Sequence, residues 1–121
     1  MSELEAGSIA NPDEKRMVGH YWLRNSDLAP NKEITGQIDQ TLSKIKEFAK
    51  KVINGQVSSE KKQTFRHILL VGIGGSALGP QFLNKALASP QDPLDLFFFD
   101  NTDADGMARV IASIPDLSRC L

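Results

Sequence analysis

The residues best suited to chemistry form a glycine-rich segment that directly follows an apolar run. The apolar run is residues 68–71 (Ile-Leu-Leu-Val), and residues 72–76 (Gly-Ile-Gly-Gly-Ser) come immediately after it. Glycines let the backbone turn tightly and approach a ligand without obstruction from side chains. A helix that begins near Ser76 would add free N–H groups, the positive end of its dipole and a serine hydroxyl. The segment therefore predicts an anion site, most naturally for a phosphate group.

The same glycines fit a second class of ligand. Gly72, Gly74 and Ala77 satisfy the G-x-G-x-x-G/A pattern of dinucleotide-binding folds, and Asp100 follows Ala77 by 23 residues. Dinucleotide folds place the acid that binds the ribose about 20 residues further on. Spacing alone therefore leaves a dinucleotide-dependent oxidoreductase open as an alternative. A purely structural role, with glycines at a close strand–helix contact, is also open.

Apolar periodicity indicates the elements that must position this segment. Between residues 34 and 52, apolar side chains recur every three or four residues, which predicts an amphipathic helix that Asn54-Gly55 would end. Residues 67–71 and 94–99 are short and almost continuously apolar, as is typical of parallel strands covered on both faces.

A helical pattern follows each predicted strand. The first covers residues 76–88, where we expect Pro80 to be tolerated because it lies in or near the first turn. At the start of the second, Thr102 and Asp105 have the spacing of a capping box, and we expect residues 100–103 to cap this helix rather than bind a ligand. The order helix, strand, helix, strand, helix predicts an α/β fold, the start of an incomplete doubly wound parallel sheet.

The predicted elements divide the chain into three parts. Residues 1–18 form a polar N-terminal tail, which we expect to be mobile over residues 1–16. Residues 19–65 hold an N-terminal arm, anchored by Tyr21 and Trp22, and the amphipathic helix. Residues 66–121 hold two βα units. Because two parallel strands leave edges and helical faces uncovered, we expect the chain to be the N-terminal portion of a longer protein.

Composition excludes several classes of protein. The chain has 121 residues, of which 40% are hydrophobic and 24% charged, and its net charge is −1. This near-neutral balance provides no basic surface for nucleic acid or membrane lipid. The single cysteine, Cys120, cannot form an internal disulfide, and no apolar run approaches the roughly 18 residues of a membrane span. Without a secretory signal at its start, the sequence predicts a cytoplasmic protein. No set of residues indicates a metal site.

The glycine segment also resembles a known family. Residues 71–80 (Val-Gly-Ile-Gly-Gly-Ser-Ala-Leu-Gly-Pro) closely resemble the G-I-G-G-S-x-L-G-P segment that opens the sugar-isomerase (SIS) domain of glucose-6-phosphate isomerases. The resemblance continues through residues 100–106 and back to residues 19–25, in the form found in bacterial and cyanobacterial members. It implies that the full-length parent interconverts glucose 6-phosphate and fructose 6-phosphate, in glycolysis and gluconeogenesis, without metal or organic cofactor, commonly as a homodimer.

The resemblance implies where the substrate would bind. The family's Gly-Ser pair contacts the substrate phosphate, which corresponds to Gly75 and Ser76 here, with Gly74 as a further candidate. The family's second phosphate loop and its catalytic Glu, His and Lys would lie beyond Leu121, so no catalytic residue is assigned and we expect the chain alone to be inactive. His20 and His67 receive no role, and we expect His67 to be structural. A non-enzymatic SIS module that senses a sugar phosphate is a further alternative.

Overall fold

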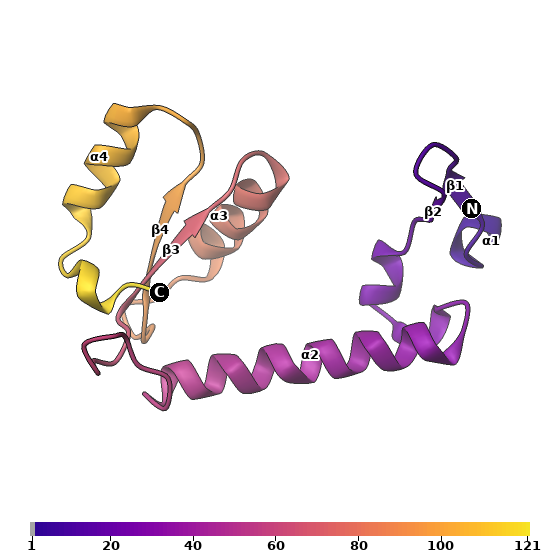
Figure 1. The fold of residues 1–121 in the computed structure, drawn as a ribbon, viewed down its shortest axis with the longest axis horizontal. Helices are drawn as coiled ribbons and strands as arrows, with labels where there is room; N and C mark the ends of the chain where they lie inside the picture. The colour runs from indigo at the N-terminus through magenta and orange to yellow at the C-terminus, as the bar shows by residue number, and fades with distance from the viewer. Residues whose placement is uncertain (1) are drawn as a thin grey trace. The chain divides into compact units, whose positions relative to one another are not determined.

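The computed structural model describes residues 2–121, which form two compact units that meet within one long helix. The N-terminal unit extends to Phe48 and the C-terminal unit begins at Ala49. The helix shared by both units is α2 (Lys32–Ile53), which has 22 residues (Figure 1). The predicted α/β class is confirmed, because the C-terminal unit contains a small open parallel sheet with helices.

The N-terminal unit has more regular structure than its sequence pattern indicated. It contains α1 (Ser2–Glu5) and an antiparallel hairpin of β1 (Ile9–Asn11) and β2 (Arg16–Met17), followed by 3₁₀ turns at His20–Leu23 and Ser26–Leu28. These elements are short and mostly exposed, so they leave no apolar periodicity in the sequence. Local polar contacts define them instead, such as the hydrogen bond from the Glu14 N–H to Asn11 Oδ1 at 3.1 Å.

Trp22 anchors the beginning of the N-terminal unit. Its side chain is 5% exposed, and its Nε1–H donates to the Glu5 carbonyl at 3.0 Å. The indole lies against the backbone of Gly19, where an added Cβ would fall 2.3 Å from two ring atoms. The ring thus buries apolar area while its single polar atom pairs with the backbone, as a buried tryptophan requires. This contact ties α1 to the segment that precedes α2.

The predicted amphipathic helix is confirmed as α2. Asn31 Oδ1 accepts from the Ile34 N–H at 2.9 Å and so caps the start of the helix. The helix ends where Gly55 adopts a φ of 69° and its N–H donates to the Val52 carbonyl at 3.0 Å. A glycine with positive φ is a common helix stop. Among residues 2–121, no helix is long and apolar enough to cross a membrane.

The C-terminal unit is built on two parallel strands. β3 (His67–Val71) pairs with β4 (Asp95–Phe99) in a register that aligns Val71 with Phe99. The connection between them is α3 (Gly75–Leu87), and α4 (Ala104–Ser113) follows β4. Figure 1 shows α3 and α4 on either side of the strand pair. Both predicted strands and both predicted helices are therefore confirmed.

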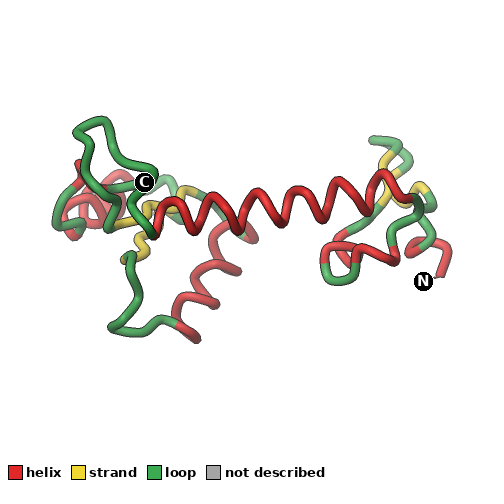
Figure 2. Tube along the Cα trace, turned by 90° about the horizontal axis from the view of Figure 1, so that it is seen from below, coloured by secondary structure: helices red, strands yellow, loops and turns green. Residues whose placement is uncertain are grey.

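The second edge of β3 is not empty, contrary to our expectation of a sheet with both outer edges exposed. After a 3₁₀ turn at Leu117–Arg119, the chain passes beside β3, and its end lies next to the strand pair in both views (Figure 1, Figure 2). The Leu121 N–H donates to the His67 carbonyl at 2.9 Å, and the Leu69 N–H donates to the Leu121 carbonyl at 3.0 Å. β3 lies between β4 and this segment, so the connection from β3 to β4 and the connection from β4 to this segment run in opposite directions across the sheet. The carboxyl end of β3 is therefore a topological switch point, where α/β sheets bind ligands.

Candidate phosphate-binding site

The glycine segment lies at this switch point and is held close to the sheet. The Gly72 N–H donates to the Phe99 carbonyl at 2.9 Å, which continues the pairing of β3 with β4 by one residue. A Cβ at Gly72 would lie 3.0 Å from Ser76 Cβ and 3.2 Å from the Ser76 carbonyl carbon. The missing side chain at Gly72 thus allows the first turn of α3 to approach the end of β3.

Gly74 provides the turn that starts α3. Its φ of 61° and ψ of −127° are in a region that residues with a side chain rarely adopt, and its position is the N-cap of the helix. It has no side chain with which to cap the helix. Gly75 and Ser76 follow as the first two helical residues, and both are exposed.

The first turn of α3 leaves backbone donors unused. The N–H groups of Ala77 and Leu78 both donate to the Gly74 carbonyl, at 3.0 and 2.9 Å. The N–H groups of Gly75 and Ser76 have no acceptor within residues 2–121. With the Ser76 hydroxyl, they form a set of exposed donors at the positive end of the helix dipole. The three residues that the family resemblance assigns to phosphate binding, Gly74, Gly75 and Ser76, are the cap and the first two residues of this helix.

Asp100 lies next to this segment but is already engaged. Its Oδ2 accepts from Gln81 Nε2 at 2.9 Å, and its Oδ1 accepts from Asn101 Nδ2 at 2.8 Å. A dinucleotide site would need this carboxylate for a ribose. Gln81 was not among the residues singled out from the sequence, because a contact between residues 81 and 100 leaves no local pattern.

Two details of the helix starts differ from expectation. The cap of α4 is Asp103, whose Oδ2 accepts from the Gly106 N–H at 2.7 Å, so the proposed Thr102–Asp105 capping box is wrong. Asn101 Oδ1 accepts from the Asp103 N–H at 2.8 Å, and this turn places Asp103 rather than Thr102 at the cap.

Pro80 is the sixth residue of α3, beyond the first turn, and its ring removes the N–H that would otherwise pair with the Ser76 carbonyl.

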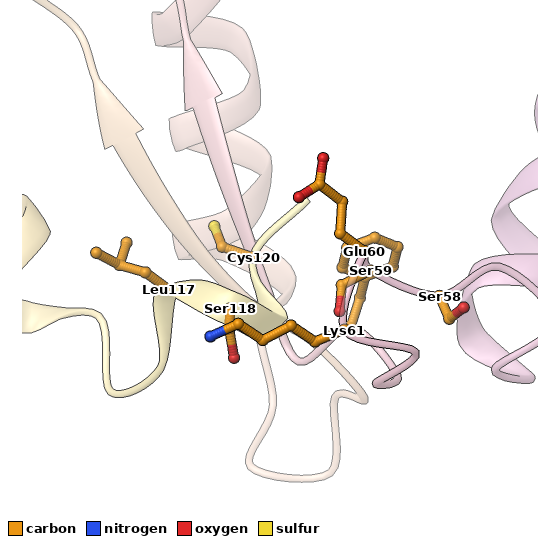
Figure 3. A pocket seen from close by; sticks show the side chains of 8 residues that line it. Ser58, Ser59, Glu60, Lys61, Leu117, Ser118 and Cys120 are labelled. Atoms are coloured by element: carbon orange, nitrogen blue, oxygen red, sulfur yellow. The ribbon is translucent and has the colours of Figure 1, made fainter.

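Two cavities lie at opposite ends of the strand pair, and residues 72–76 line neither of them. A cavity of about 220 Å³ lies beyond the carboxyl end of β4, and Asp100, Asn101 and Arg109 are among its lining residues. A larger cavity, of about 430 Å³, is formed by segments that precede β3 and by residues 117–120 (Figure 3). Figure 3 shows Lys61 extending toward Ser118 in this cavity, while Glu60 points away. This larger cavity lies at the amino end of β3 and is separate from the glycine segment.

The histidines and the cysteine do not join the candidate site. His67 opens β3 at its amino end, is 6% exposed and packs edge-on against Phe97, which fits a structural role. Its Nδ1 lies 3.2 Å from Asp95 Oδ2 without hydrogen-bond geometry. The His20 ring lies beside the Tyr21 ring in the N-terminal unit, with the two ring planes tilted by 50°. Residues 2–121 contain no cluster of His, Cys, Asp and Glu that could hold a metal ion.

Comparison with known proteins identifies relatives along the whole chain. The family model described as phosphoglucose isomerase matches residues 1–120. The glucose-6-phosphate isomerase of Geotalea daltonii is 57% identical over 114 residues, which cover 94% of this chain and 22% of that protein. The glucose-6-phosphate isomerase of Nostoc sp. PCC 7120 is 54% identical, with the same coverage. That of Cyanothece sp. PCC 7425 is 52% identical over 100% of this chain and 23% of its own length. The chain therefore spans less than a quarter of these relatives.

Proposed function

Because the chain belongs to the phosphoglucose isomerase family, we propose that it supplies the N-terminal part of an enzyme that interconverts glucose 6-phosphate and fructose 6-phosphate. The observation that supports this most strongly is the family match over residues 1–120. The identity of 52–57% with three named glucose-6-phosphate isomerases supports the same substrate pair. The physical support is the exposed set of unused donors at the start of α3.

In this proposal the substrate phosphate binds the first turn of α3. The N–H groups of Gly75 and Ser76 and the Ser76 hydroxyl donate to phosphate oxygens, and Gly74 supplies the backbone turn that exposes them. Hydrogen bonds to a charged acceptor contribute roughly 1.5–3 kcal/mol each. Two or three such bonds are enough to hold a phosphorylated sugar in one orientation.

This chain's contribution to the reaction is binding rather than proton transfer. Aldose–ketose isomerisation moves a proton between two adjacent sugar carbons and needs a general base near them. Anchoring the phosphate, which is remote from those carbons, fixes the sugar relative to such a base and so raises the rate by orientation. We assign no base within residues 2–121, because none of the glutamates lies beside the glycine segment in the sequence or on α3.

The two alternatives from the sequence are less well supported. Family membership favours an isomerase over a dinucleotide-dependent oxidoreductase, and both carboxylate oxygens of Asp100 already accept hydrogen bonds from Gln81 and Asn101. The named relatives are enzymes, which favours an isomerase over a non-enzymatic sensor of sugar phosphates. Titration with NADH or NADPH is expected to show no binding.

Location and assembly are part of the same proposal. We expect the enzyme that contains this chain to be cytoplasmic and to form a homodimer, as the family resemblance implies. Sedimentation equilibrium of the complete enzyme would measure the assembly, and a monomer at micromolar concentration would contradict it.

A chimeric enzyme tests the proposed activity directly. In the Geotalea daltonii isomerase, the matching N-terminal segment would be replaced by this chain, and the conversion of fructose 6-phosphate would be followed in a coupled assay. We expect activity within about tenfold of the unmodified enzyme, since the two segments are 57% identical. The 121-residue chain alone is expected to show no turnover. A folded chimera without activity would contradict the proposal.

A further inference from the structure

We propose that Gln81 and Asp100 form a positioning pair, which fixes the first turn of α3 in the orientation that phosphate binding requires. This inference rests on the proposed function, because it concerns the same phosphate site. It assigns a role to two residues that do not themselves touch the phosphate. Their hydrogen bond, Gln81 Nε2 to Asp100 Oδ2 at 2.9 Å, joins α3 to the end of β4.

The helix that bears the phosphate site has few other fixed points. Ala77, with 0% exposure, is the only residue of α3 that is buried within the described chain. Large apolar side chains elsewhere on the helix are more than half exposed: Leu78, Phe82, Leu83 and Leu87. Within residues 2–121, full burial therefore fixes the start of α3 at Ala77, and the bond from Gln81, about one turn further on, adds a second attachment that limits rotation of the helix.

Asp100 is in turn connected to the start of α4 and to the end of β4. Its Oδ1 accepts from Asn101 Nδ2 at 2.8 Å, and Asn101 Oδ1 in turn accepts from the N–H of Asp103, the cap of α4. Asp100 also directly follows Phe99, whose carbonyl accepts from the Gly72 N–H. Gly72 is thus bonded to Phe99, and α3 is bonded through Gln81 to Asp100, so both sides of the glycine segment are attached to the end of β4.

Gln81 donates this hydrogen bond and Asp100 accepts it, so the proposal can be tested by exchanging the donor and the acceptor between the two positions. Gln81→Leu removes the donor without adding charge, and Gln81→Glu places two carboxylates against each other. The double variant Gln81→Glu/Asp100→Asn restores one donor and one acceptor with the net charge unchanged. The amide introduced at position 100 would donate to position 81, and its oxygen would still accept from Asn101. Gln40→Leu, on an exposed face of α2, is the matched control.

The measurements are KM and kcat for fructose 6-phosphate in the chimeric enzyme described above. We expect Gln81→Leu to raise KM about fivefold with kcat within twofold, Gln81→Glu to raise KM further, and the double variant to return KM to within twofold of the parent. Gln40→Leu should leave both constants unchanged. A purely structural role would instead lower the active fraction and Tm without changing KM.

Three outcomes would overturn the positioning pair: an unchanged KM in Gln81→Leu, a double variant as impaired as Gln81→Glu, or a drop in kcat for Asp100→Ala that exceeds any effect at Gln81. Amide hydrogen exchange at Gly75–Leu78 in the ligand-free chimera gives an independent readout. Exchange should be faster in Gln81→Leu and return to the parent rate in the double variant. An inactive parent chimera would count against the proposed function alone, since this exchange pattern does not require turnover.

Discussion

The two strand-to-helix junctions of the C-terminal unit differ in the side chains that lie at the start of each helix. After β4, the Asp103 carboxylate caps α4 by accepting from the Gly106 N–H, and Asn101 accepts from the Asp103 N–H, while the N–H groups of Ala104 and Asp105 have no acceptor within residues 2–121. After β3, the cap is a glycine, and the N–H groups of Gly75 and Ser76 find no acceptor within residues 2–121. Both junctions lie at the carboxyl edge of the same two-stranded sheet.

The comparison shows that fold alone does not make a binding site. The two junctions share topology, sheet edge and helix polarity, so the helix dipole is available at both. What differs is the local sequence: the carboxylates of Asp103 and Asp105 lie at the start of α4 (the closed junction), whereas Gly74 and Gly75 leave the start of α3 without a carboxylate and open to an anion (the open junction). An open junction is less stable by itself and gains more from an anion. Changes at the two junctions should therefore affect different measured quantities.

The largest expected effect comes from placing a charge at the open junction. In the chimeric enzyme, Ser76→Asp puts a carboxylate where the substrate phosphate would bind and removes a hydroxyl donor. We expect KM for fructose 6-phosphate to rise at least about tenfold, or ~1.4 kcal/mol. Folding should be spared, because an acidic residue near a helix N-terminus is favourable. Ser76→Ala, which keeps the backbone donors, should have a smaller effect. An unchanged KM in folded Ser76→Asp would refute the phosphate site.

The second-largest expected effect distinguishes two roles of the glycines in the open junction: the backbone conformation of Gly74 and the space for a ligand at Gly75. Gly74→Ala forces a side chain onto a residue with a φ of 61°, which should cost about 1–3 kcal/mol and lower Tm. An added Cβ at Gly75 would meet no atom within 4 Å, and its φ is not positive, so Gly75→Ala should leave Tm nearly unchanged. Because that Cβ would enter the proposed ligand space, KM should rise. Equal Tm values for the two variants would show that the turn at Gly74 is not strained.

Much of the open junction could be predicted from the sequence, because its signals are local. An apolar run that ends in glycines marks both the strand and the turn, and the period of apolar residues marks the start of α2 to within two residues. The pairing of residues 119–121 with β3 left no such signal, since it joins segments about 50 residues apart and rests on backbone groups. The bond between Gln81 and Asp100 escaped prediction because it joins two polar side chains 19 residues apart, which leaves no local pattern.

The closed junction shows a different limit of sequence interpretation. Residues 100–103 (Asp-Asn-Thr-Asp) offer four short polar side chains in succession, and each of them can cap a helix. Spacing favoured Thr102 with Asp105, but the structure uses Asp103, because Asn101 first turns the backbone around it. The backbone path from β4 to α4 determines which of several adjacent polar residues caps the helix. The types of these residues alone do not determine that path.

A moderate effect is expected from removing the cap of the closed junction. Asp103→Ala should destabilise the start of α4 by about 1 kcal/mol and lower Tm, as the loss of a cap typically does. KM for fructose 6-phosphate should stay within twofold, because the proposed phosphate site is at the start of α3 and not at this junction. Thr102→Ala is the control and should change neither quantity. A larger Tm loss in Thr102→Ala than in Asp103→Ala would restore the capping box that the structure contradicts.

The smallest effect concerns the 3₁₀ turn at Leu117–Arg119, which Asp116 caps and which precedes the segment that pairs with β3. Asp116 accepts from the Ser118 hydroxyl at 2.7 Å and from the Ser118 N–H at 2.9 Å, and these bonds hold the pKa of its carboxyl below the ordinary value of 3.8. A group whose pKa is lower in the folded state stabilises the fold above its unfolded pKa, and this contribution is lost as the pH falls through the folded value.

We therefore expect Asp116→Asn in the chimeric enzyme to lower Tm slightly at pH 6, and the difference from the parent to shrink as the pH is lowered below about 4. The effect should be small because water and salt screen a carboxylate on an accessible turn. KM at pH 6 should not change, since Asp116 precedes a segment that enters the sheet at the amino end of β3, opposite the phosphate site. A Tm difference that grows toward low pH would mean that the charged carboxylate does not stabilise this turn. A change in KM would mean that the turn and the open junction are coupled.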